Sequence, residues 1–479
     1  MTLRKTKIVA TLGPSSSSEA VLAQMIDAGV DVVRLNFSHG TAEDHIARAD
    51  LVRKLGWERR RPVGVLCDLQ GPKIRLGKFE HGKIELQDGD PFILDAACTL
   101  GNRQRVGLDY RTLPQEVEPG AVLLLDDGRI VMKVVAVRGQ EVHCVVEVGG
   151  VLSNNKGINR KGGGLAAEAL TDKDKEDIKT AAALEADFVA ISFPRSGADV
   201  EYARQLVRAA GCQASIVAKI ERAEAIPVLE EIIDAADVIM VARGDLGVEV
   251  GDAAVPGLQK RMIRMARARN KIVITATQMM ESMITNPIPT RAEVSDVANA
   301  VLDGTDAVML SAESAAGKYP VEAVEAMHRV CYEAEKDYDS QDLLEQRLPR
   351  QFERIDQAIA MSAVHVAAHL NKVKAIASLT QSGTSVMWLS RSNTLVPIYA
   401  LSSEKVTRRK LTLFRGVYPY PFEQNTDDRD QILQDAEQEL RARGAVEDGD
   451  LILLTIGEPI GKSGGTNTLK IVKVGEHRN

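Results

Sequence analysis

The same short hydrophobic pattern occurs eight times between Lys7 and Glu313. Each run is rich in Val, Ile, Leu and Ala and ends on a polar or charged residue, which predicts a strand buried on both faces. Stretches with 3.6-residue apolar spacing separate the runs, so the strands are expected to be parallel and the fold to be a closed (β/α)8 barrel. The runs span residues 7–13, 31–38, 63–71, 187–194, 215–221, 237–245, 272–278 and 306–313.

Polar and charged residues gather at the carboxyl ends of these predicted strands. In a (β/α)8 barrel that end of the strands carries the active site. Because a buried charge is costly unless it is paired or binds a ligand, these side chains are candidates for binding a substrate or a metal. They are Arg34, Asn36, Ser38, Asp68, Lys219, Glu221, Asp245, Thr277, Ser311 and Glu313.

A long insertion separates the third predicted strand from the fourth. Between residues 83 and 148 apolar positions alternate and are interrupted by turn signals, which predicts a small antiparallel β-barrel or sandwich. Its return segment is rich in Gly and Asn and carries Lys156, Arg160 and Lys161. An insertion at this place lies over the barrel mouth, where it is expected to act as a lid.

A second α/β unit is predicted after the barrel. A charged stretch over residues 336–354 is expected to link the two, and an open parallel sheet follows, with 469–474 as its edge strand. The predicted fold class is therefore a (β/α)8 barrel with an inserted β lid domain and a C-terminal α/β open-sheet domain. The expected divisions are 1–71 and 169–340 for the barrel, 72–168 for the lid and 341–479 for the C-terminal domain.

Composition excludes several classes of function. The chain has 479 residues, about two hundred more than a barrel of ~250. A net charge of -7 and 4% aromatic residues argue against a nucleic-acid surface. Five scattered cysteines without paired spacing favour neither disulfides nor zinc and fit a reducing cytoplasm. No apolar run approaches ~18 residues, so neither a signal peptide nor a membrane span is expected.

The most informative polar cluster combines Lys219, Glu221 and Asp245. Residues two apart on a strand face the same side, so Lys219 and Glu221 both point into the barrel mouth. Carboxylates from adjacent strands suit Mg²⁺ or Mn²⁺, and the lysine is then placed to neutralise a second anion. A buried salt bridge among the three is the structural alternative. The segment ARGDLG is expected to begin a helix whose N–H groups bind an anion, unless Asp245 only caps it.

Two further motifs carry groups suited to phosphate. RLNFSHG supplies Arg34, whose guanidinium fits bidentate phosphate recognition, with Asn36, Ser38 and His39 beside it, although a lone histidine is as often structural. DLQGPKIR carries Asp68, Lys73 and Arg75 at the start of the lid, where Gly71 and Pro72 form a hinge. Arg75 is expected to reach a phosphate as the lid closes, unless these charges are merely solvated.

Two segments resemble phosphate-binding loops, and only one of them remains a candidate. LTIGEPIGKS has its glycines one residue too close together and no helix after it, which excludes a nucleotide-binding P-loop. TQSGTS, by contrast, follows a predicted strand and begins a helix, so hydroxyl and N–H groups converge on one point. A plain helix cap is the alternative. The candidate anion-binding residues are Thr380, Ser382, Gly383, Thr384 and Ser385.

Long strings across nearly the whole chain are similar to the motifs of the pyruvate kinase family. The resemblance extends from Lys5 to the last strand and is closest to the shorter bacterial enzymes that sugar monophosphates or AMP activate. It implies transfer of the phosphoryl group of phosphoenolpyruvate to ADP, an allosteric homotetramer and a cytoplasmic location. The strings are RLNFSHG, GPKIR, LSNNKGIN, AKIE, MVARGDLGVE, ATQMMESMI, PTRAEVSDVANAVLDGTDAVMLSAE and GTNT.

The resemblance also implies roles for individual residues. Glu221 and Asp245 would hold Mg²⁺, Lys219 would meet the transferring phosphoryl group, and Arg34 would bind the substrate phosphate. The substrate carboxylate would be bound by the N–H groups of Arg243, Gly244 and Asp245 together with Thr277. The nucleotide would lie near Asn36, His39, Arg75 and Lys156. The relay that protonates the enolate would include Thr277, Ser311 and Glu313, and the loop from Thr380 to Ser385 would grip an effector phosphate.

Lys73 departs from the commonest pattern of the family. Many pyruvate kinases carry Glu at this place and require K⁺, which is bound by residues matching Asn36, Ser38, Asp68 and the carbonyl group of Leu69. A lysine ammonium beside that site is expected to replace the ion, so K⁺ should not be required. Two other functions remain open at this stage. They are a metal-dependent barrel aldolase or lyase, and a sugar-phosphate sensor built on an inactive barrel.

Overall fold

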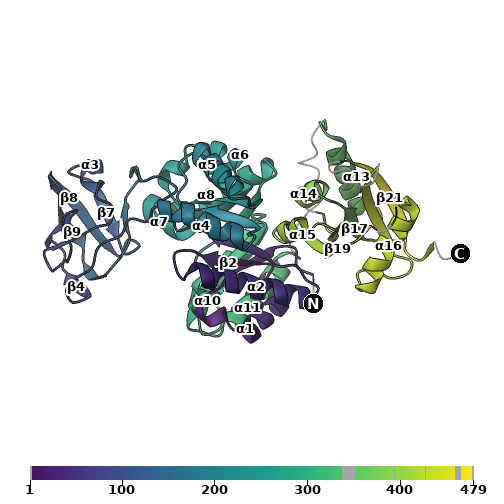
Figure 1. Ribbon diagram of the computed structural model, residues 1–479, viewed down its shortest axis with the longest axis horizontal. Helices are drawn as coiled ribbons and strands as arrows, with labels where there is room; N and C mark the ends of the chain where they lie inside the picture. The colour runs from purple at the N-terminus through teal and green to yellow at the C-terminus, as the bar shows by residue number, and fades with distance from the viewer. Residues whose placement is uncertain are drawn as a thin grey trace.

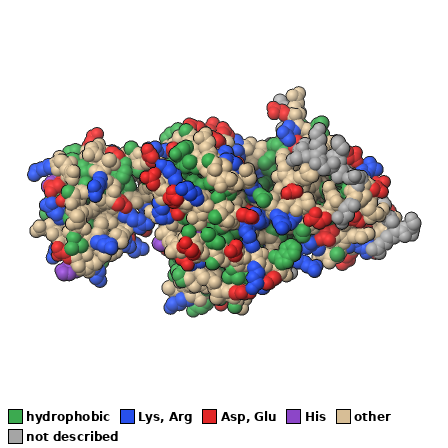
Figure 2. Space-filling view, viewed as in Figure 1, with side chains coloured by type: hydrophobic (Ala, Val, Ile, Leu, Met, Phe, Trp, Pro, Cys, Tyr) green, Lys and Arg blue, Asp and Glu red, His purple; other side chains and the backbone are tan. Residues whose placement is uncertain are grey.

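The structure is a computed structural model of the chain, and Figure 1 shows its three parts side by side. The barrel lies in the middle, the inserted domain at one end and the C-terminal domain at the other. Figure 2 shows acidic and basic side chains interspersed over the visible face of all three parts. The structure describes all residues except 1–2, 337–350, 393, 425, 427, 459–464 and 477–479.

The eight predicted barrel strands all form, and they close into one parallel barrel. Neighbours along the sequence are neighbours in the barrel, except that the insertion interrupts the chain between β3 and β12. The strands are β1 (Lys7–Thr11), β2 (Val32–Asn36), β3 (Gly64–Asp68), β12 (Phe188–Ile191), β13 (Ser215–Ile220), β14 (Val238–Ala242), β15 (Ile272–Ala276) and β16 (Ala307–Leu310).

Amphipathic helices surround these strands, and their apolar sides form the largest hydrophobic cluster of the molecule. Capping boxes at Thr41, Thr171 and Thr290 fix where three of them begin. The barrel helices are α1 (Glu19–Ala28), α2 (Ala42–Glu58), α4 (Asp172–Ala183), α5 (Gly197–Ala209), α6 (Leu229–Ala235), α7 (Arg243–Val250), α8 (Val255–Ala268), α9 (Arg291–Leu302), α10 (Ala312–Ala315) and α11 (Pro320–Ala334).

Four aspartates repeat at the amino ends of alternate barrel strands. Each carboxylate accepts the N–H of a residue on a preceding strand. They are Asp31 to Ile8 at 2.9 Å, Asp187 to Val65 at 2.9 Å, Asp237 to Ile216 at 2.7 Å and Asp306 to Val273 at 2.9 Å. These bonds fix the strand ends opposite the predicted active site.

Asp306 also joins the barrel to the C-terminal domain, because Arg391 donates to both of its carboxylate oxygens and both side chains are buried. We expect Asp306→Ala to lower the free energy of unfolding by about 3–5 kcal/mol, since it leaves a buried guanidinium unpaired. Asp237→Ala is the matched control, because its partner Arg204 is partly exposed and the loss should be smaller. Urea unfolding measures both, and equal losses would contradict this explanation.

The inserted domain is built from β-structure, as expected. Its six-stranded sheet has the order β11-β7-β8-β9-β5-β6, and β4 pairs with β10 in a separate ribbon. All strand pairs are antiparallel except β5 with β6. The elements are β4 (Lys83–Leu86), β5 (Pro91–Asp95), β6 (Arg105–Val106), α3 (Leu113–Glu116), β7 (Val122–Leu125), β8 (Ile130–Arg138), β9 (Glu141–Val148), β10 (Gly150–Ser153) and β11 (Ile158–Arg160).

The C-terminal domain contains the predicted open sheet in the order β19-β18-β17-β20-β21. Its first four strands are parallel, and the predicted edge strand β21 forms but runs antiparallel to β20. The predicted linker falls mainly outside the described residues. The elements are α13 (Ile355–His369), β17 (Val373–Leu379), α14 (Thr384–Arg391), β18 (Ile398–Ser402), α15 (Lys405–Leu411), β19 (Val417–Pro421), α16 (Arg429–Ala442), β20 (Leu451–Gly457) and β21 (Thr466–Lys473).

Within the described ranges, none of the helices combines the length and the apolar character that a membrane span needs. The excluded P-loop lookalike includes residues 459–463, which lie outside the described part of the chain.

Candidate active site

Four charged side chains meet at the carboxyl ends of β2, β3 and β13. Lys219 Nζ lies 2.9 Å from Glu221 Oε1 and 3.1 Å from Asp68 Oδ1. Arg34 Nε lies 2.6 Å from Asp68 Oδ2. The alternation of side chains on β13 brings Lys219 and Glu221 together, as predicted, and parallel pairing of β2 with β3 places Asp68 beside them. Arg34, Asp68, Lys219 and Glu221 form the strand-end cluster.

Burial sets the electrostatics of this cluster. It raises the pKa of Glu221 to about 7, opposed by the attraction of Lys219 and reinforced by the nearby carboxylates of Asp245 and Asp68. For Asp68, burial also favours the neutral form, but Lys219 and Arg34 together lower its pKa below the usual value. Burial works against the charge of Lys219, and the two carboxylates raise its pKa nevertheless. Lys219 is therefore held as an ammonium.

Helix α7 begins directly after β14 and places its first turn at the barrel mouth. The N-cap residue is Ala242, which offers no side-chain cap, and Asp245 lies in the first turn of the helix. The Gly244 N–H donates to Thr277 Oγ1 at 2.8 Å, and Thr277 has φ +68°, a strained conformation for a β-branched residue. The Arg243 side chain turns away to Asp296 at 2.7 Å, which leaves its backbone at the mouth.

The donors at this point suit a hard divalent cation. Asp245 Oδ1 lies 3.9 Å from Lys73 Nζ and remains partly exposed, and no described ion pair joins it to Lys219. The described residues contain no cluster of three acidic, histidine or cysteine side chains able to hold a metal. Mg²⁺ fits such a site, because it commonly binds one or two carboxylates and completes its shell with water and substrate oxygens.

Other predicted residues at the strand ends have mainly local partners. Asn36 Oδ1 accepts the Ser38 N–H at 3.1 Å, and His39 is exposed in the same turn. Glu313 is buried, and its two oxygens accept the N–H groups of Ser311 at 2.7 Å and Met280 at 3.1 Å. Burial raises the pKa of Glu313. Glu313 thus fixes the loops around Ser311, within reach of the barrel mouth.

Two predicted nucleotide-binding cations point into the inserted domain and do not join the strand-end cluster. Lys156 Nζ pairs with Asp126 Oδ1 at 2.7 Å, and Arg75 Nη1 donates to the Asn155 carbonyl at 3.2 Å. Both partners belong to the inserted domain. Figure 1 shows the inserted domain beside the barrel, at one end of the molecule.

Sequence reasoning missed two hydroxyl groups of the site. Ser192 Oγ accepts from Lys219 Nζ at 2.7 Å, and Thr11 Oγ1 accepts from Arg34 Nη1 at 3.0 Å. Both residues lie near the carboxyl ends of predicted barrel strands, so their position was a usable signal. Serine and threonine are common in loops, however, and only the folded barrel brings them to the two cations.

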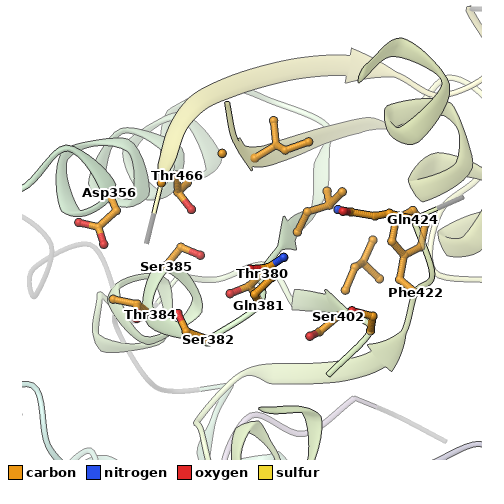
Figure 3. Close-up of a pocket in the computed structure, with 16 residues that line it drawn as sticks. Asp356, Thr380, Gln381, Ser382, Thr384, Ser385, Ser402, Phe422, Gln424 and Thr466 are labelled. Atoms are coloured by element: carbon orange, nitrogen blue, oxygen red, sulfur yellow. Dashed lines mark hydrogen bonds between the residues drawn. The ribbon is translucent and has the colours of Figure 1, made fainter. Parts of the chain in front are cut away.

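A second polar pocket lies in the C-terminal domain, between β17 and α14 (Figure 3). The N-cap of α14 is Gly383 with φ +84° and no side-chain cap, so a plain side-chain cap is excluded. Thr380 Oγ1 accepts the Gly383 N–H at 2.9 Å, and Ser382 and Thr384 share a hydroxyl contact of 3.0 Å. The predicted hydroxyls therefore converge, with Ser385, on one pocket; other lining residues are Asp356, Gln381, Ser402, Ser403, Phe422, Gln424 and Thr466.

The barrel, the inserted domain and the paired cations at the strand ends together define a phosphotransferase of the (β/α)8 class. The family model described as "Pyruvate kinase, barrel domain" matches residues 3–324, and "Pyruvate kinase, alpha/beta domain" matches residues 357–472. The chain belongs to the pyruvate kinase family.

Curated relatives agree over nearly the full length. Pyruvate kinase II of Salmonella typhimurium strain LT2 is 54% identical over 477 residues, covering 98% of this chain and 99% of its own. Pyruvate kinase of Haemophilus influenzae is 54% identical over 461 residues (95% and 96%), and that of Geobacillus stearothermophilus is 43% identical over 473 residues (98% and 80%). An aldolase, a lyase or an inactive sensor is not favoured by these findings. Enzymes of this family generally require a divalent metal ion and K⁺.

Proposed function

We propose that the chain transfers the phosphoryl group of phosphoenolpyruvate to ADP, giving pyruvate and ATP, with the strand-end cluster as its centre. The observation that carries this proposal is the pairing of Arg34 and Lys219 through one buried carboxylate, Asp68. Phosphoryl transfer spreads charge over three outer oxygens, so fixed cations and positioning supply most of the catalysis. Pyruvate formation from phosphoenolpyruvate and ADP in a coupled assay with Mg²⁺ tests it directly.

The substrate groups are assigned by charge and position. Arg34 binds the phosphate and Lys219 neutralises the transferring phosphoryl group, while Glu221 and Asp245 hold Mg²⁺ or Mn²⁺. The bound ion would supply positive charge that stabilises the negative charge of the transferring group. The N–H groups at the start of α7 and the Thr277 hydroxyl bind the carboxylate. The α7 residues concerned are Arg243, Gly244 and Asp245, and the lack of a side-chain cap from the N-cap residue Ala242 supports this role.

Two further roles rest on position at the barrel mouth. Thr277, Ser311 and Glu313 form a relay that delivers a proton to the enolate. Burial raises the pKa of Glu313, which favours the protonated form and so supports its role as a proton donor. Closure of the inserted domain brings Arg75 and Lys156 toward a nucleotide held near Asn36 and His39. Such closure also excludes water and so prevents loss of the phosphoryl group to hydrolysis. Membership of the pyruvate kinase family supports a homotetramer that acts in the cytoplasm.

Lys73 replaces the K⁺ ion on this proposal. Its ammonium lies 3.9 Å from Asp245, and the family ion ligands already have internal partners: Asp68 pairs with two cations, Asn36 binds Ser38, and the Leu69 carbonyl accepts Ser192. A fixed cation at this distance supplies the positive charge that the ion otherwise provides.

We therefore expect nearly full activity in tetramethylammonium buffer without K⁺. Lys73→Glu should create a K⁺ requirement of at least about tenfold, because it removes one charge and adds the opposite one. Lys78→Glu is the control: it reverses the charge of an exposed residue between β3 and β4 and should create no K⁺ requirement. Assays are run at matched ionic strength to hold screening constant. Strong K⁺ stimulation of the wild type, absent with choline, would show that Lys73 does not replace the ion.

The C-terminal pocket binds the phosphate of an allosteric effector, a sugar monophosphate or AMP. It is supported by the hydroxyl groups of Thr380, Ser382, Thr384 and Ser385, which converge at the start of α14 (Figure 3). The described lining residues include no lysine or arginine, which favours one phosphate over two.

Ser382→Asp should abolish activation by such a monophosphate and leave turnover without effector intact, because the added carboxylate repels the phosphate. Ser362→Asp is the control, since this exposed serine on α13 lies outside the pocket lining. Activity is measured over a range of effector concentrations. Unchanged activation in Ser382→Asp would exclude this pocket.

A further inference from the structure

A tight turn after β12, formed by Ser192 and Phe193, contacts two members of the strand-end cluster. The buried Ser192 hydroxyl donates to the Leu69 carbonyl at 2.8 Å and accepts from Lys219 Nζ at 2.7 Å. The Phe193 N–H donates to Glu221 Oε2 at 3.0 Å. One turn therefore holds both the ammonium and the carboxylate that β13 presents to the barrel mouth.

The same turn contacts the outgoing connector, which we define as residues 69–82, between β3 and the first strand of the inserted domain. Gly71, with φ +68°, lies so close that an added Cβ would come within 2.6 Å of Ser192 Cβ and 3.2 Å of the Phe193 ring. Only glycine permits this approach, which explains the glycine at position 71 of the predicted hinge. The neighbouring Leu69 carbonyl is the acceptor of the Ser192 hydroxyl, so the connector is bonded to the turn as well as packed on it.

The return connector is the segment from the inserted domain back to the barrel, residues 161–171. It is linked to the turn through Arg222, which follows β13. The guanidinium carbon lies 5.1 Å from the centre of the Phe193 ring, and Nη1 donates to the Leu165 carbonyl at 3.2 Å. Both Arg222 and Phe193 are buried. Phe193 has φ +59°, a conformation that a bulky residue adopts only when its surroundings enforce it. The turn is thus held between the two connectors of the inserted domain.

The ammonium of Lys219 has three N–H donors. In this structure it donates a hydrogen bond to Ser192 and forms ion pairs with Asp68 and Glu221. With Glu221 assigned to the metal, the hydrogen bond to Ser192 and the ion pair with Asp68 remain to fix the ammonium. One N–H is then left for a phosphoryl oxygen. A lysine side chain is flexible, so two fixed acceptors are needed to define where its charge lies.

We propose that Ser192 is a positioning residue for Lys219, and that the Ser192–Phe193 turn transmits movement of the inserted domain to Lys219 and Glu221. Closure of the domain moves both connectors. The outgoing connector is bonded to the turn and packs on it, and the return connector is linked to the turn through Arg222, which donates to the Leu165 carbonyl and packs on Phe193. The proposal rests on the function proposed above for Lys219 and Glu221. It adds a physical link by which lid position sets the geometry of the reacting groups.

Ser192→Ala tests the positioning role. We expect kcat to fall about tenfold, the loss expected for one hydrogen bond to a charged group. The KM for phosphoenolpyruvate, the Mn²⁺ affinity of the free enzyme and the unfolding midpoint should stay close to wild type, because no charge or metal ligand is removed. Ser390→Ala is the matched control: its buried hydroxyl also donates to a carbonyl, of Arg415, and accepts from a cation, Arg391, but lies in the C-terminal domain.

The outcomes separate cleanly. Ser390→Ala should leave kcat unchanged. A kcat of Ser192→Ala within about twofold of wild type, or a loss of Mn²⁺ affinity or unfolding midpoint in step with kcat, would overturn the positioning role. Wild-type protein that forms no pyruvate would instead overturn the proposed function, and an active Lys219→Met variant would overturn the role of that lysine.

A double-mutant cycle tests transmission through the turn. Arg222→Met keeps the side-chain stem but removes the bond to Leu165, and should lower kcat about threefold in the wild type and much less in Ser192→Ala. Arg195→Met is the control, because Arg195 donates to Ala166 on the same connector at 3.0 Å without a described contact to the turn. Additive losses of kcat for Arg222→Met and Ser192→Ala would overturn the transmission.

Discussion

Lys219→Met should lower kcat by about 10² to 10³ and change the KM for phosphoenolpyruvate far less. The ammonium stabilises negative charge that develops on the phosphoryl group during its transfer. Loss of the ammonium therefore destabilises the transition state more than the bound substrate. Methionine preserves most of the stem and removes only the charge. Pyruvate formation with saturating Mg²⁺ and ADP gives both constants.

Lys260→Met is the control for this experiment. Lys260 is an exposed lysine on α8 whose ammonium pairs with Asp303 and does not belong to the strand-end cluster. Its replacement removes the same charge and should leave kcat within about twofold of wild type. If Lys219→Met also stays within about threefold, Lys219 does not stabilise the phosphoryl group.

The barrel was predictable because two patterns alternate along the sequence: short hydrophobic runs, which predict buried strands, and apolar residues with 3.6-residue spacing, which predict helices. Residues such as Lys219 and Glu221 follow from strand alternation alone, and the rule that active sites lie at strand carboxyl ends identified Asp68 and Arg34. The structure confirms that these four meet. The C-terminal sheet was also predicted, but not the antiparallel direction of β21, since the local pattern of an edge strand does not encode its direction.

Tertiary contacts explain what the sequence left undetermined. Ser192 is one of many serines, and its role appears only when β12 is placed beside β13. Arg75 and Lys156 carry suitable charges, but their direction depends on how the inserted domain is placed, and here they face that domain. The aspartates before β2, β12, β14 and β16 repeat visibly in the sequence, yet the N–H groups that donate to their carboxylates lie on other strands.

Metal dependence provides the second large effect. Removal of divalent ions by a chelator should abolish pyruvate formation, and either Mg²⁺ or Mn²⁺ should restore it, because the assigned ligands are carboxylate oxygens of Glu221 and Asp245. Structural zinc sites instead combine several cysteine or histidine ligands, and the described residues contain no cluster of three His, Cys, Asp or Glu side chains able to hold a metal.

Glu221→Gln separates the metal ligand from the rest of the site. The amide keeps the size of the side chain and an acceptor for the Phe193 N–H, but it is a poorer ligand for a hard cation than a carboxylate. We expect Mn²⁺ affinity to fall by at least the ~10–100-fold that loss of an outer-shell partner typically costs. Glu249→Gln is the control, because this buried carboxylate on α7 accepts from Ala223 and lies outside the strand-end cluster. Mn²⁺ affinity is measured on the free enzyme. Equal affinities in the two variants would show that Glu221 does not bind the ion, and burial alone would then account for the raised pKa of Glu221.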